Sequence, residues 1–149
     1  MKSNLFKYTL ITSFIVTFLF SINGFSQELD ASNYKLKFSF KTVKQFDNSR
    51  LLEVSFIGQN KKDRKDIVPV ANAEIKFFNN LNEEEILLGT SKTSNEGTAQ
   101  LIIPENYNYL TEEEGNINFL ARFKTTDAMD AEEAEITVKN LHLELDLKE

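Results

Sequence analysis

The sequence predicts an all-β protein, an antiparallel β-sandwich of about seven to eight strands preceded by a signal peptide. Apolar and polar residues alternate in short runs along most of the chain. Turn-forming residues recur roughly every ten residues, a spacing typical of sandwiches and barrels. No long window keeps a helical period, so the two-residue period of a strand dominates.

The first 26 residues have the pattern of a secretory signal peptide. The segment Met1 to Lys7 contains two lysines and no acidic residue, and residues 10–22 are almost entirely apolar. Gly24 and Ser26 place small residues where a signal peptidase reads them. The apolar run is shorter than the roughly 20 residues that a membrane-spanning helix needs. We therefore expect cleavage near Ser26 and export to the periplasm, the cell surface or the medium, with no membrane span remaining.

The rest of the chain divides into a short polar leader, residues 27–33, and one domain, residues 34–149. The chain contains no cysteine, which excludes disulfides, a thiolate nucleophile and a cysteine-based zinc site. The formal net charge is −6, and removal of the signal lysines makes the domain more acidic. Because an acidic domain repels phosphate backbones, we expect no nucleic-acid partner.

The first half of the domain predicts three strands. In residues 34–41, apolar residues alternate with mostly lysine, which indicates one buried face and one basic, solvated face. Residues 52–56 repeat the alternation, and the charged residues 59–66 are expected to form an exposed loop. Residues 73–77 predict the third strand, and residues 79–84 a hairpin-like connection.

The second half begins with a short apolar strand at residues 86–89. The clearest turn of the chain follows at residues 93–97, where Gly97 is expected to have a positive φ. Further strands are expected at residues 99–103, 117–123, 136–138 and 141–147. In the last of these, leucines alternate with polar residues. On a sheet edge, its unpaired amides could pair with another chain.

Six motifs follow one another between Pro69 and Asn140. They are Pro69-Val70, Ala73-x-Ile75-x-Phe77-Phe78, Leu87-Leu88-Gly89-Thr90, Thr93-x-x-x-Gly97-x-Ala99-x-Leu101, Ile117-x-Phe119-x-Ala121-x-Phe123 and Ala134-x-Ile136-Thr137-Val138. This series resembles the bacterial Ig-like domain repeat of exported and cell-surface proteins, and more distantly transthyretin-like and carboxypeptidase-regulatory-like domains. The resemblance implies an immunoglobulin-like β-sandwich that serves as a spacer, adhesive module or binding module.

The sequence contains no recognisable catalytic constellation. Its single histidine, His142, has no cysteine or second histidine with which to build a typical zinc site. No Gly-x-Ser-x-Gly elbow and no phosphate-binding glycine loop occurs. We therefore expect a non-catalytic module without a cofactor, for protein binding, adhesion or structural support of a cell-envelope assembly. A small hydrolase is a less favoured alternative function.

Two residue pairs are the candidate ligand contacts. Tyr107 and Tyr109 could present an aromatic patch to a glycan, which makes a carbohydrate-binding module the main alternative function. Tyrosines at sandwich corners more often pin a loop, however. Asp127 and Asp130 are the candidate calcium ligands, because calcium prefers carboxylate oxygens. They lack the alternating spacing of a calcium-binding loop, so no metal is expected.

Overall fold

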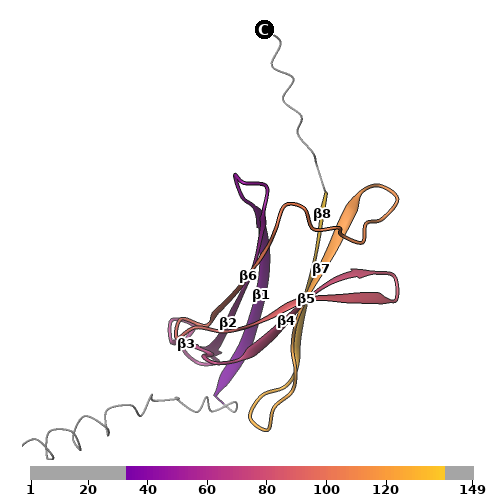
Figure 1. Ribbon diagram of the computed structural model, residues 1–149. Helices are drawn as coiled ribbons and strands as arrows, with labels where there is room; N and C mark the ends of the chain where they lie inside the picture. The colour runs from indigo at the N-terminus through magenta and orange to yellow at the C-terminus, as the bar shows by residue number, and fades with distance from the viewer. Residues whose placement is uncertain (1–32, 140–149) are drawn as a thin grey trace, which may run out of the picture.

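A computed structural model describes residues 33–139 as two antiparallel β-sheets (Figure 1). The strands are β1 (Tyr34–Lys44), β2 (Arg50–Asn60), β3 (Ile67–Pro69), β4 (Glu74–Leu81), β5 (Glu84–Lys92), β6 (Thr98–Ile103), β7 (Asn116–Phe123) and β8 (Glu132–Lys139). The predicted all-β sandwich is confirmed. The described residues include no helix that could span a lipid bilayer. The predicted signal peptide and the strand expected at residues 141–147 lie outside the described residues.

The first sheet is built around β2. The whole of β1 pairs with one side of β2. On the other side, residues 50–55 pair with β6 and residues 57–59 pair with β3. Every second residue of β2 faces inward, so Leu52, Val54 and Phe56 are completely buried. Burial of each such side chain contributes about 1.5–3 kcal/mol.

The second sheet has the strand order β5–β4–β7–β8, and its inner face meets the first sheet in an aromatic core. The Phe56 ring lies 5.3 Å from Phe38 and 5.0 Å from Phe123, measured between ring centroids. Phe77 and Phe119 are completely buried beside them. Such tilted and edge-to-face pairs add to the stabilisation that burial provides. The core therefore joins the two sheets mainly through phenylalanine.

Two turns show how local conformation sets the strand boundaries. Gly97 has a φ of 75°, as the sequence predicts. The predicted connection over residues 79–84 is too long, because β4 continues to Leu81 and β5 begins at Glu84. Asn82 supplies the positive φ, 56°, that a two-residue hairpin loop requires. Asn79 and Asn80, which precede this loop, belong to β4, although their polarity indicates a turn.

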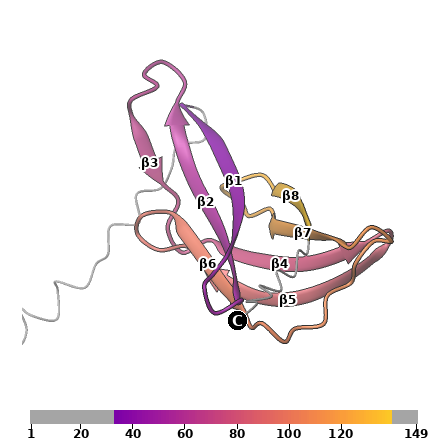
Figure 2. The same ribbon diagram turned by 90° about the horizontal axis from the view of Figure 1, so that it is seen from above.

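The two sheets approach each other at two corners, β5 beside β6 and β1 beside β8 (Figure 2). The β5–β6 corner is closely packed because Gly89 has no side chain. A Cβ atom at that position would lie 2.9 Å from Cδ1 of Leu101. Ala99 and Ile103 of β6 are buried at the same corner. At the β1–β8 corner the inner side chains of both strands are half-buried.

Candidate functional site

The corner between β1 and β8 leaves its inner side chains half-buried. These residues define the open corner: Leu36, Phe38 and Phe40 of β1 with Ala134, Ile136 and Val138 of β8. The inward residues of the neighbouring strands are, in contrast, completely buried: Leu52, Val54, Phe56, Ile117, Phe119 and Ala121. Both β1 and β8 are the last strands of their sheets, so no further described strand covers the open corner.

The free edge of β1 presents a row of backbone groups that no described strand covers. Gln45 donates its N–H to the Ser49 carbonyl at 2.8 Å, and Lys61 donates its N–H to the Asn33 carbonyl at 2.9 Å. Because hydrogen-bonded residues alternate along an antiparallel pair, the odd-numbered residues of β1 bond to β2. The backbone groups of the even-numbered residues therefore point to the free edge, where no strand within residues 33–139 pairs with them. The even-numbered residues include Leu36, Phe38 and Phe40.

The outer face of β1 is basic. Lys35 and Lys37 are exposed, and neither forms an ion pair within residues 33–139. Lys41 lies 2.5 Å from the Glu53 carboxylate. Hydrogen bonds from Lys41 and Gln100 hold the pKa of Glu53 below its usual range. The two lysines near the start of β1 are thus available to acidic side chains on an added strand.

The outer face of β8 has the opposite charge. Glu133 and Glu135 lie on this face, and Lys139 lies on it at the end of the strand. Arg122 donates to Glu133 at 2.6 Å, and Asn80 donates to Glu135 at 2.9 Å. An acidic strand would therefore meet like charges at β8 and lysines at β1, which makes β1 the favourable edge.

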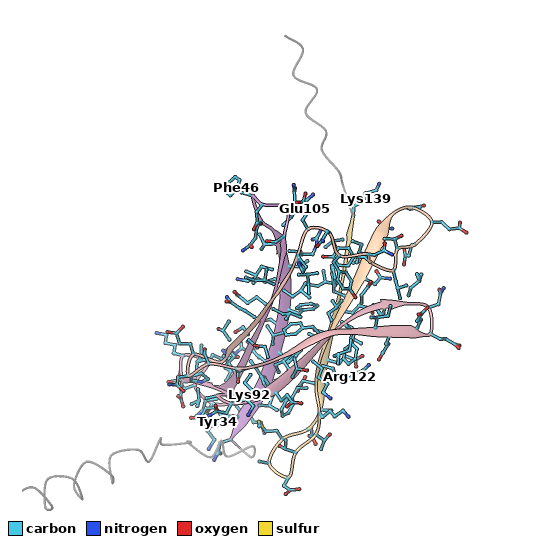
Figure 3. The ribbon with its side chains drawn as sticks, viewed as in Figure 1. Tyr34, Phe46, Lys92, Glu105, Arg122 and Lys139 are labelled. Atoms are coloured by element: carbon cyan, nitrogen blue, oxygen red, sulfur yellow. The ribbon has the colours of Figure 1, made fainter. Side chains whose placement is uncertain are left out.

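A groove of about 480 Å³ lies where β1 begins, facing the β7–β8 loop. Tyr34 and Leu36 form one wall, and residues 126–130 form the other. The Tyr34 hydroxyl donates to Asp66 at 2.7 Å, and Asn60 donates to the same carboxylate oxygen at 2.9 Å. The bond from Tyr34, followed by that from Asn60, lowers the pKa of Asp66, while Asp66 raises the pKa of Tyr34. This network fixes Tyr34 at the groove margin, at the opposite end of the molecule from Lys139 (Figure 3).

The calcium candidates Asp127 and Asp130 both line this groove. Their side chains are exposed on the β7–β8 loop, which a hydrogen bond from Thr126 N–H to the Met129 carbonyl closes at 2.9 Å. Within residues 33–139, no three histidine or acidic side chains gather closely enough to hold a metal ion. Asp127 and Asp130 stay candidate ligands only, and the expectation that no metal binds stays a sequence-based prediction.

Tyr107 and Tyr109 lie on the connection between β6 and β7 and pack against the core. Their ring centroids are 5.0 Å apart, and the Tyr109 ring meets Phe119 edge-to-face at 5.5 Å. Burial raises the pKa of the Tyr109 hydroxyl, and the nearby Arg50 offsets part of this effect. Both rings are half-buried, an arrangement that fits the loop-pinning interpretation. Glycan binding by this pair stays a prediction.

The same connection is held by a residue that sequence reasoning missed. Asn79 is completely buried in β4. Its Oδ1 accepts the Leu110 N–H at 2.6 Å, and its Nδ2 donates to the carbonyls of Leu110 at 3.1 Å and Asn118 at 3.0 Å. Its sequence neighbours suggested a polar turn, so no local signal could have identified it. Asn79 therefore links the connection to the second sheet.

Sequence reasoning also missed the free edge of β1. The alternating lysines over residues 34–41 were the available signal, but alternation does not reveal whether a strand is central or at an edge. His142 lies outside the described residues. In comparisons with protein-family models, curated proteins and solved structures, none matches this chain.

Proposed function

We propose that this protein is an exported, non-catalytic module that binds an extended segment of a protein at the free edge of β1. One observation carries the proposal. Along residues 34–41 of β1, backbone groups with which no strand within residues 33–139 pairs, a half-buried apolar row and a row of lysines occur together. An added strand gains affinity from main-chain hydrogen bonds and specificity from its alternate side chains. The β1 edge supplies both kinds of contact.

The strand order supports an immunoglobulin-like assignment. In that architecture, strands A, B and E share one sheet, strands C, F and G share the other, and a C′ strand can extend the second sheet. The order β1–β2–β6 corresponds to A–B–E, and β5–β4–β7–β8 corresponds to C′–C–F–G. This assignment agrees with the family resemblance, which implies spacer, adhesive and binding modules.

Residues 1–26 supply the export part of the proposal, since they have the pattern of a signal peptide. An exported binding module would act in the periplasm or at the cell surface, in adhesion or in supporting an envelope assembly. The proposal requires no cofactor. Its binding surface is the β1 edge rather than the Tyr107–Tyr109 pair, because the two tyrosines lie on a connection without a strand edge and their rings pack on each other and on Phe119.

Site-specific photo-crosslinking in exporting cells tests this function. A photoreactive residue replaces Lys37, which is exposed on β1, and a matched control replaces Glu96, which is exposed before β6 on the far side of β2. We expect polypeptide adducts from position 37 whose crosslinked peptide maps to one extended segment, and none from position 96. Equal adducts from both positions, or none from position 37, would contradict the proposal.

A further inference from the structure

Residues 141–147, which follow β8 in the sequence, have the pattern of a strand that needs its own apolar partner. Odd-numbered leucines alternate there with His142, Glu144 and Asp146. The inward residues of β8 are even-numbered, as in Ile136 and Val138. Because side chains alternate between faces, a straight continuation of β8 would turn the leucines away from the core. In that phase, the leucines of residues 141–147 would need an apolar surface other than this core to cover them.

A hairpin folded back onto β8 of the same chain is unfavourable. Lys139 still pairs with Asn116, which leaves Asn140 alone to reverse the chain. The common tight hairpin loops contain two residues. Such a hairpin would also bring Glu144 and Asp146 to the acidic outer face of β8.

The β1 strand of the same chain is equally hard to reach. The groove places the start of β8 beside the start of β1, and Lys139 lies at the end of the molecule that also holds Phe46, just beyond β1 (Figure 3). The two strands therefore run in the same direction. An antiparallel strand along the chain's own β1 would need the same reversal at Asn140.

The β1 edge of a second copy offers a partner that matches in shape and charge. One antiparallel register sets leucines 141, 143 and 145 opposite Phe40, Phe38 and Leu36, respectively. The same register sets Glu144 opposite Lys37 and Asp146 opposite Lys35. It also brings Leu147 opposite Tyr34, at the groove where β1 begins. Apolar contacts and opposite charges thus occur together in a single register.

We infer that residues 141–147 of one copy add to the free edge of β1 of a second copy as an antiparallel strand. This inference rests on the proposed function and names its partner. Donor and acceptor surfaces differ, so the contact is heterologous. Reciprocal exchange between two copies closes a dimer, and successive exchange builds a linear assembly.

Charge exchange tests the inference without changing the core. One variant carries Glu144→Lys and Asp146→Lys, and a second carries Lys35→Glu and Lys37→Glu. Each creates like charges across the proposed strand pair, so each should self-associate roughly tenfold or more weakly than the unaltered protein. A mixture of the two restores opposite charges at both possible contacts and should associate again. Sedimentation velocity of the processed, exported protein measures all three samples, with circular dichroism as the check on folding.

The matched control carries Lys62→Glu and Lys65→Glu, which change the charge equally on the exposed loop after β2. It should associate like the unaltered protein. Monomeric unaltered protein at the highest soluble concentration, or a mixture that stays monomeric, would overturn the inference. Crosslinks from position 37 to a different protein would likewise overturn it while leaving the proposed function intact. Absence of any crosslink at position 37 would remove the proposed function itself.

Discussion

Replacement of Gly97 by alanine should destabilise the sandwich far more than the same replacement at Gly115. Both glycines have a positive φ, 75° and 77°, respectively. At either position, an alanine in that left-handed conformation would lower the stability of the fold by about 1–2 kcal/mol. The two sites differ in what the new Cβ atom would meet. A Cβ atom at Gly115 would have no neighbouring atom within 4 Å, whereas a Cβ atom at Gly97 would clash with the Phe56 carbonyl oxygen.

The extra cost at Gly97 follows from the bonds around that carbonyl. The Phe56 N–H donates to the Gly97 carbonyl at 2.7 Å, and the Phe56 carbonyl accepts the Val70 N–H at 3.0 Å. Moving the two segments apart weakens both hydrogen bonds, each worth about 0.5–1.5 kcal/mol. We therefore expect Gly97→Ala to lower the free energy of unfolding by about 2–5 kcal/mol, and Gly115→Ala by about 1–2 kcal/mol.

Urea denaturation followed by far-ultraviolet circular dichroism measures the difference, since the chain has no tryptophan to report on unfolding. The midpoint should fall for both variants and fall further for Gly97→Ala, with an unchanged slope. Equal losses at the two positions would refute the close approach of the Gly97 turn to β2. A stabilised Gly97→Ala variant would refute the positive φ as well.

Three further predictions concern the core, the buried asparagine and pH. Phe119→Ala should cost about 3–5 kcal/mol of stability because the ring is completely buried, whereas Phe46→Ala, at a fully exposed ring, should cost under about 0.5 kcal/mol; similar urea midpoints for both would contradict the core assignment. Asn79→Ala should cost about 2–4 kcal/mol through lost hydrogen bonds, and Asn106→Ala, exposed on the same connection, should leave the midpoint unchanged; equal effects would argue against the Asn79 contacts. Stability should also fall on acidification from about pH 5 to about pH 3, because hydrogen bonds hold several carboxyl pKa values below their unfolded values of about 4. Stabilisation by such groups is present above the unfolded pKa and is lost as pH falls through the folded one, so a midpoint that stays constant or rises over this range would contradict the assignment. The carboxyl groups are those of Asp47, Glu53, Asp66, Glu85 and Glu112.

Local pattern was enough to predict most of the strands. Alternation along β2 directly reflects a strand with one face against the core, because side chains on successive residues point to opposite faces. The Gly97 turn was also predictable, since few residues other than glycine adopt its φ. Both features depend on residues close together in the sequence.

Features that depend on distant residues could not be predicted in this way. In the sequence, Asn79 resembles part of a polar turn. Its hydrogen-bond partners Leu110 and Asn118 lie far along the chain and are close to it only in the folded structure. The alternation in β1 resembles that of β2, yet only strand order shows that β1 is at an edge. For the same reason the candidate binding edge emerged from the strand arrangement, whereas the half-burial of Tyr107 and Tyr109 fits the loop-pinning interpretation that the sequence favours.

The hydrogen bonds from Asn79 to Leu110 have a consequence for how the chain can change in length. Connections between strands ordinarily tolerate inserted residues and are the usual targets of proteases. The segment after β6 is instead fastened to the second sheet at Leu110 and packed through Tyr109 against Phe119. Residues inserted into this segment would break the hydrogen bonds between Asn79 and Leu110. Length variation and proteolytic cleavage should therefore concentrate in the charged loop after β2.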